Sequence, residues 1–334
     1  MSKNSQPWPR REGAVRVGGL RLHYAAWGPR GAPPLILLHG GAANSHWWDW
    51  VAPELAGAFR VLALDFPGHG KSEWPRPPRY RMHDFVRAVV GFADGLGIGH
   101  LDLVGHSMGG KVAMLTGAWH PRRARSLVVV DGAPDVSADG LAEMRQIGAR
   151  PLRRFLSRQA AARAFRLIPP ETVARPARLR TLATRSTRHR GHGRWSIGPD
   201  REFFARVIPQ VAWPLLPRIA CPTLILRAER SSILGRQTAQ AMRRAIPHAT
   251  LCEIPGHLPS PHPGAAGRCR QGDPRLRNGA CPRRAQATRQ PVRGIPGANG
   301  VASQPAREVP AGGPVRVSAL EGIGAARMQP SSFS

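Results

Sequence analysis

The sequence predicts an α/β protein with a doubly wound, mostly parallel sheet. Three observations support this prediction. Short apolar runs typical of buried strands alternate with segments of helical period. One such run, residues 101–104, leads directly into Gly105-His106-Ser107-Met108-Gly109, and residues 110–114 continue as a helix. The composition then changes at about residue 133 and again after residue 257. Alternating strands and helices favour a parallel sheet with right-handed crossovers.

The expected elements follow from local periodicity. An alternating run is typical of an edge strand, and uninterrupted apolar runs are typical of buried parallel strands. The edge run is residues 20–26, and the buried runs are residues 35–38, 61–64, 101–104 and 127–131. Residues 82–96 are expected to form a helix, because its apolar positions fall on one face. Pro121 should end the helix that follows the serine motif.

Ser107 is predicted to be a nucleophile. A serine on a tight turn from strand to helix is held in a strained backbone conformation, with its hydroxyl directed away from the sheet. Gly105 and Gly109 let the strand and the helix pass closely, because a Cβ at either position would clash. The Met108 N–H, at the start of the helix, is placed to stabilise an oxyanion. The motif lies at the carboxyl end of its strand, where such sheets place active sites.

Two further segments carry a family resemblance. The strand at 35–38 ends in His39-Gly40-Gly41, and the strand at 61–64 leads into Asp65-Phe66-Pro67-Gly68-His69-Gly70-Lys71-Ser72. With the serine motif, they make residues 15–257 resemble the α/β-hydrolase superfamily, in its serine-nucleophile esterase and carbon–carbon hydrolase branch. The resemblance implies that the Gly41 N–H is the second oxyanion donor beside Met108. It gives the loop at 65–72 a shaping role and no catalytic one.

The resemblance also implies the catalytic base. Residues 250–254 are similar to the last strand of the family, and His257 falls in the loop that carries the family's histidine. A neutral imidazole there takes the serine proton and returns it to the leaving group. The family usually places one or two more residues before this histidine, so a surface-loop histidine is the alternative. His248 and His262 are weaker substitutes.

The acid of the triad has two candidates. The family most often carries it in the loop after the seventh strand, within residues 222–234, but Ser232 stands where many relatives have aspartate. Asp131, at the end of the sixth strand, is the favoured acid, although many relatives keep a structural aspartate there. Glu229, at the mouth of the usual loop, is the alternative, and a third possibility is that neither residue serves.

Residues 133–214 are expected to form a helical cap inserted after the sixth strand. The expected helices are at 140–149, at 152–167 and near 200–208, and residues 136–214 hold 16 arginines against five acids. A cap roofs the nucleophile and excludes water. Its charge favours anionic substrates, although a solvated outer face is the commoner explanation. The expected substrate contacts are His39, His106, Trp47 and Trp48, and packing accounts for the two tryptophans equally well.

The expected domain organisation has four parts. Residues 1–132 and 215–257 form the hydrolase core, residues 133–214 form the cap, and residues 258–334 form a tail. The tail holds 11 prolines and 11 glycines among 77 residues and no helical period. We expect it to be either disordered or the product of a shifted reading frame, since the family normally follows its histidine with an amphipathic helix.

Charge and composition limit the partners. The net charge is +29, but 46 of the 49 basic residues are arginine, which is typical of codon bias, and they are not interleaved with aromatic residues as in a nucleic-acid groove. We therefore expect no specific nucleic-acid partner. No N-terminal apolar run and no membrane-length segment occur, so we expect a cytoplasmic protein without membrane attachment. No metal or other cofactor is expected, and the composition leaves the oligomeric state open.

The expected function is that of a serine hydrolase that cleaves a carboxylic ester through an acyl-enzyme on Ser107. A serine at this position disfavours the epoxide hydrolase and haloalkane dehalogenase branches, because the resemblance implies carboxylate nucleophiles there. Carbon–carbon bond hydrolysis of a ring-cleavage product and thioester hydrolysis are the alternative reactions. A non-catalytic protein of the same fold is the alternative from another class, because the usual acid and the last helix are both missing.

Overall fold

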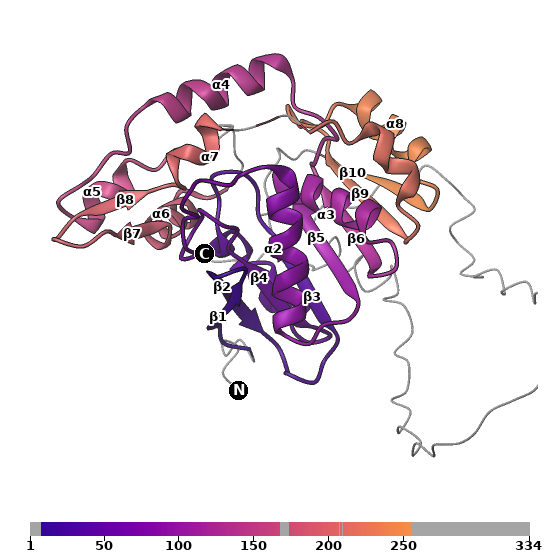
Figure 1. The fold of residues 1–334 in the computed structure, drawn as a ribbon, viewed down its shortest axis with the longest axis horizontal. Helices are drawn as coiled ribbons and strands as arrows, with labels where there is room; N and C mark the ends of the chain where they lie inside the picture. The colour runs from indigo at the N-terminus through magenta and orange to yellow at the C-terminus, as the bar shows by residue number, and fades with distance from the viewer. Residues whose placement is uncertain (1–7, 168–173, 207, 209, 256–334) are drawn as a thin grey trace, which may run out of the picture. The chain divides into compact units, whose positions relative to one another are not determined.

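A computed structural model describes residues 8–167, 174–206, 208 and 210–255 (Figure 1). Its main sheet has eight strands in the order β1-β2-β4-β3-β5-β6-β9-β10. The strands are β1 (Arg11–Val17), β2 (Leu20–Trp27), β3 (Pro34–Leu38), β4 (Arg60–Leu64), β5 (Leu101–His106), β6 (Ala124–Val130), β9 (Thr223–Ala228) and β10 (Ala249–Ile254). The α/β fold class expected from the sequence is confirmed.

The sheet is antiparallel at one edge and parallel elsewhere. β1 pairs with β2, and β2 with β4, in antiparallel register, while β4, β3, β5, β6, β9 and β10 run parallel. The parallel strands are buried along most of their length, which matches their continuous apolar sequence. Because parallel strands end at one edge, the loops after β3, β5, β6, β9 and β10 begin at the same edge of the sheet.

Helices cover both faces of the sheet. One apolar cluster joins it to α2 (Met82–Gly95), α3 (Met108–Trp119), η2 (Trp213–Arg218) and α8 (Arg236–Ala245). The second cluster joins the opposite face to η1 (Ser45–Trp48) and α1 (Ala52–Leu55). In α2, Phe85, Val89 and Phe92 are fully buried, as the expected apolar face requires. α3 ends at Trp119, just before Pro121.

The segment between β6 and η2 contains both helices and a small hairpin. Its helices are α4 (Ala138–Ala149), α5 (Arg158–Arg163), α6 (Pro176–Arg185) and α7 (Arg201–Ala205), and its hairpin joins β7 (Thr187–His189) to β8 (Trp195–Ile197). We call this segment the cap. The expected helix at 152–167 is wrong in extent, because Ser157 caps α5 through the Ala160 N–H and Phe155 forms a bridge with Trp195.

β1 lies at the edge of the sheet beyond the first expected strand, and its alternating exposure explains why no apolar run marks it. The tail expected at 258–334 lies outside the described residues, as does His257. Among the helices of the described part, none is long and apolar enough to cross a membrane.

Candidate active site

Ser107 occupies a strained turn between β5 and α3. Its φ of 51° and ψ of −116° are unusual for a residue with a side chain, and such strain concentrates at functional sites. The Ser107 N–H donates to the Val130 carbonyl at 2.9 Å, which ties the turn to β6. Ser107 and Met108 are half-buried, so the serine retains solvent access.

Two glycines make this turn possible. A Cβ built on Gly105 would lie 2.2 Å from the Gly109 carbonyl oxygen. A Cβ built on Gly109 would lie 2.2 Å from the Leu38 carbonyl oxygen at the end of β3. Both distances are shorter than any side chain tolerates. The spacing of glycines two residues before and two after the serine therefore has the close-packing role predicted from the sequence.

The loop after β3 lies beside Ser107. A Cβ on Gly40 would be 3.3 Å from the Ser107 Cβ and 3.0 Å from the His106 Nδ1. The buried His39 Nε2 accepts from the Phe66 N–H at 3.1 Å, so its Nδ1 carries the proton and donates to the Gly40 carbonyl at 2.7 Å. Burial lowers the pKa of His39 and keeps its ring neutral. In a trans peptide the next N–H, that of Gly41, points away from the His39 ring.

Asp131 follows β6 and is 2% exposed. Its Oδ1 accepts from the Ala228 N–H at 3.0 Å, and its carboxylate also bonds the Ser231 hydroxyl. Burial is the largest effect and raises the pKa of Asp131. The two hydrogen bonds and the charge of Arg227 act in the opposite direction, and the net pKa is about 6. Asp131 has a φ of 44°, which is a second unusual backbone angle at this edge of the sheet. A Cβ on Gly132 would lie 3.0 Å from the Ser107 carbonyl oxygen, so the Asp131–Gly132 turn adjoins the turn that carries Ser107.

Glu229 follows β9 and is exposed. The buried Arg227 side chain holds its loop by donating to the Glu229 carbonyl at 3.0 Å and to the Leu234 carbonyl at 2.8 Å. The Ser231 hydroxyl accepts from the Ile233 and Leu234 N–H groups, which closes a tight turn. The two candidate acids therefore lie at the same edge of the sheet, but Asp131 is buried and Glu229 is exposed.

The candidate bases are separated by the topology. His248 lies directly before β10, at the amino edge of the parallel strands, and is exposed. Ser107 lies at the carboxyl edge, so β10 separates His248 from it. The loop that follows Ile254 begins at the carboxyl edge, and His257 is three positions further in the sequence. His257 and His262 both lie outside the described residues, so their assignment stays a prediction.

The four expected substrate contacts have different surroundings. His106 is 7% exposed and stacks on the half-buried Trp47, with ring centroids 6.1 Å apart. Trp48 is 2% exposed and packs in the apolar cluster around η1 and α1, where packing accounts for it. His39 is fully buried with both ring nitrogens hydrogen-bonded. Its observed contacts orient the loop after β3.

Comparison with known proteins decides the family. A family model described as the alpha/beta hydrolase fold matches residues 33–262, which is more than half of the chain. The chain belongs to the alpha/beta hydrolase family. The resemblance inferred from the three motifs is therefore confirmed.

Individual relatives of this alpha/beta hydrolase cover different shares of it. The crystal structure of an alpha/beta hydrolase from Novosphingobium aromaticivorans is 30% identical, with a TM-score of 0.61 over 76% of this chain and 92% of that chain. Epoxide hydrolase 4 from Homo sapiens is 32% identical over 118 residues, 35% of this chain and 33% of that protein. The 2-hydroxymuconate semialdehyde hydrolase from Pseudomonas sp. (strain CF600) is 42% identical over 103 residues, 30% of this chain and 36% of that protein. The chain spans about a third of the length of these two curated relatives.

The structure adds two residues of this alpha/beta hydrolase that sequence reasoning missed. Phe203 of α7 is fully buried and would lie 3.7 Å from a Cβ on Gly41, so the cap contacts the loop after β3. Ser231 bonds the Asp131 carboxylate. No sequence signal links either pair, since each joins segments about 100 positions or more apart. Ser231 is a polar residue in the loop where the family usually carries its acid, and this position was the one sequence feature that pointed to it.

The cap is anchored beside this site by polar contacts. Asn44, after the His39 loop, donates to the Ser186 hydroxyl at 2.9 Å. Asp200 accepts from the Tyr80 hydroxyl at 2.8 Å and pairs with Arg76 at 2.5 Å. Within the described ranges, no group of three or more His, Cys, Asp or Glu side chains is placed to hold a metal ion.

Proposed function

We propose that this alpha/beta hydrolase cleaves a carboxylic ester through an acyl-enzyme on Ser107. The observation that carries the proposal is the backbone of Ser107, held at a φ of 51° between the carboxyl end of β5 and the start of α3. A half-buried hydroxyl on such a turn is positioned for nucleophilic attack. The family membership and the packing of Gly40 against Ser107 support the same assignment.

The first chemical step forms the acyl-enzyme. The Ser107 Oγ attacks the ester carbonyl carbon while His257 accepts its proton. The negative charge that develops on the carbonyl oxygen is stabilised by the N–H groups of Gly41 and Met108. The carbon–oxygen bond of the ester then breaks, and the alcohol leaves with the proton from His257.

The second step regenerates the enzyme. A water molecule transfers a proton to His257 and attacks the acyl carbon, and the Ser107 oxygen leaves with that proton. Asp131 is the proposed acid that orients His257 and stabilises its charged form. Its position supports this role because β5, β6 and β10 end at the same edge of the sheet. Glu229 stays as the alternative.

One alternative reaction has a specific observation in its favour. A relative named 2-hydroxymuconate semialdehyde hydrolase is 42% identical over 103 residues, so carbon–carbon bond hydrolysis is the second candidate. Another relative is named epoxide hydrolase 4, but this chain has a serine where the resemblance implies a carboxylate nucleophile in that branch. Ester hydrolysis is therefore the first reaction to test.

The test is turnover of p-nitrophenyl acetate and butyrate by the full-length protein. We expect saturable hydrolysis that is abolished in Ser107→Ala and retained in Ser126→Ala, a matched substitution at a serine on β6. Hydrolysis that persists in folded Ser107→Ala would refute the proposal. A folded wild-type protein that turns over neither ester would favour the non-catalytic alternative.

A further inference from the structure

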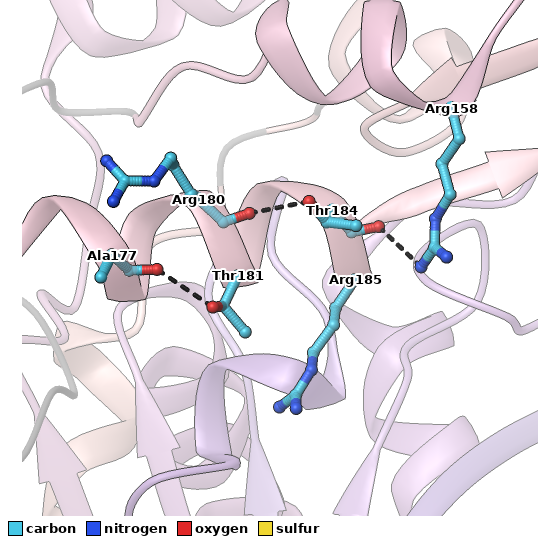
Figure 2. Close-up of a pocket in the computed structure, with 6 residues that line it drawn as sticks. All are labelled: Arg158, Ala177, Arg180, Thr181, Thr184 and Arg185. Atoms are coloured by element: carbon cyan, nitrogen blue, oxygen red, sulfur yellow. Dashed lines mark hydrogen bonds between the residues drawn. The ribbon is translucent and has the colours of Figure 1, made fainter.

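An open surface pocket of about 520 Å³, which we call the cavity, lies on the cap where α5 packs against α6. It is lined by Arg158, Ala177, Arg180, Thr181, Thr184 and Arg185 (Figure 2). Its volume lies within the range of small-molecule sites, but it is open to solvent and its arginines are exposed. None of its lining residues belongs to the proposed catalytic machinery.

The charge of this cavity is one-sided. Three of its six lining residues are arginines and none is an acid. Arg185 pairs with Asp49 at 2.6 Å, but Asp49 also lies 3.1 Å from the Arg10 Nε and 2.8 Å from the His46 Nδ1. One carboxylate is thus shared between two arginines, Arg185 and Arg10, so the cavity wall keeps excess positive charge.

Arg158 is held in place by neutral groups. Its Nε donates to the Thr187 hydroxyl and its Nη2 to the Thr184 carbonyl, each at 3.2 Å. Its guanidinium also lies 5.9 Å from the centre of the Trp195 ring. These contacts use two of its five N–H donors and no carboxylate, so Arg158 is a pre-positioned cation with spare donors.

The remaining polar groups add no negative charge. The Thr181 hydroxyl donates to the Ala177 carbonyl and the Thr184 hydroxyl to the Arg180 carbonyl, both within α6. Figure 2 shows the Arg180 side chain extending toward the Ala177 end of this stretch, and Arg158 approaching its other end. Arg158 and Arg180 are therefore spread along the cavity wall, while Arg185 extends away from them toward Asp49. A ligand that meets both Arg158 and Arg180 needs more than one anionic group.

We propose that this cavity binds a small molecule through two or more of its phosphate groups. Guanidinium groups recognise phosphate oxygens through paired, charge-assisted hydrogen bonds. A phosphate carries more charge than a carboxylate and accepts from several donors at once, which suits spare donors on separate arginines. The proposal concerns a binding site and does not depend on the reaction proposed for Ser107.

Two sources of such a ligand are compatible with the position of the cavity. α6 packs against η1, and Asn44 at the start of η1 donates to the Ser186 hydroxyl directly after α6. Since η1 follows the Gly41 loop, the phosphates can belong to the carrier portion of an acyl substrate. Alternatively, they belong to a separate ligand that binds the cap alone.

The binding test uses adenosine 3′,5′-bisphosphate, titrated calorimetrically into the full-length protein at about 0.15 M salt, where weak surface attraction is screened. We expect the double variant Arg158→Gln/Arg180→Gln to weaken binding about tenfold or more, because charge-assisted hydrogen bonds are lost. The control is Arg178→Gln with Arg145→Gln. It makes the same change in charge at one residue of α6 and one of α4 outside the cavity. Thermal unfolding establishes that both variants are folded.

The outcomes decide the proposal. Selective weakening in the cavity variant supports it. Absence of binding to the wild type, or equal weakening in the control, would overturn it and assign the affinity to general basic charge.

A second measurement separates the two sources. The ratio of kcat/KM for acetyl-coenzyme A to that for S-phenyl thioacetate falls in the cavity variant if the phosphates belong to the substrate. An unchanged ratio with weakened bisphosphate binding assigns the site to a separate ligand. Bisphosphate binding by a protein that hydrolyses no ester or thioester would refute the proposed reaction but support the proposed binding site.

Discussion

The carboxylate of Asp131 accepts a hydrogen bond from the backbone N–H of Ala228 at 3.0 Å. This bond joins the residue after β6 to the last residue of β9, so the two positions from which the family can supply an acid lie together. Asp131 is buried, whereas Glu229 is exposed. Their environments make them separable by experiment.

The catalytic pair is predicted to act as one unit. Ser107→Ala and His257→Ala should each remove nearly all p-nitrophenyl ester turnover, and the double variant should lose little more, because nucleophile and base cooperate in one step. Steady-state kinetics on folded proteins provide the measurement. Additive losses in the double variant would show that the two residues act independently.

Asp131 and Glu229 form a matched test of the acid. Asp131→Asn should lower kcat by about 10³ to 10⁴, since the imidazole loses its orientation and its charged form loses stabilisation. Glu229→Gln should retain most activity. The reverse ranking would transfer the role to Glu229. Full activity in both folded variants would indicate a Ser–His dyad.

Asp131 should also make stability depend on pH. Burial raises its pKa from an ordinary 3.8 to about 6, so the folded protein binds this proton more tightly than the unfolded chain does. The stabilising contribution is present below about pH 4 and is lost as the pH rises through about 6. The loss amounts to at most about 3 kcal/mol.

Urea unfolding of the wild type and Asp131→Asn at several pH values measures this effect. The variant carries no ionisable group at this position. Its free energy of unfolding, relative to that of the wild type, should therefore increase between pH 4 and pH 7. A difference that stays constant over this interval would contradict the assigned pKa.

The turn from β5 to α3 should not tolerate a side chain at Gly109. Gly109→Ala places a Cβ 2.2 Å from the Leu38 carbonyl oxygen, and relieving this clash should cost about 1–3 kcal/mol despite the better helix propensity of alanine. Gly31→Ala is the control, because nothing lies within 4 Å of the added Cβ. Equal free energies of unfolding for the two variants would show that β3 and α3 are less closely packed than described.

Local sequence signals predicted the parts of the fold that depend on local physics. Residues 101–109 predicted a buried strand, a tight turn and a helix, and the structure places all three there. The period of residues 82–96 likewise predicted α2 and its buried face. In these segments, the apolar residues whose spacing predicts the helix or strand are the same residues that the structure buries.

The missed parts depend on contacts between distant segments. The hairpin of β7 and β8 has strands of only three residues, Thr-Arg-His and Trp-Ser-Ile, which are too short to give an alternating apolar signal. The helix expected at 152–167 is shortened because Phe155 pairs with Trp195 about 40 positions away. The approach of Phe203 to Gly41 arises in the same way, from packing of the cap on the core.

The most direct test of the central claim is covalent labelling of the full-length protein with a fluorophosphonate, followed by peptide mass spectrometry. Such a probe reacts with serines activated by a neighbouring base. The account predicts one modified peptide, with the adduct on Ser107, and no labelling of folded Ser107→Ala. An unlabelled wild-type protein, or an adduct that persists in Ser107→Ala, would contradict it.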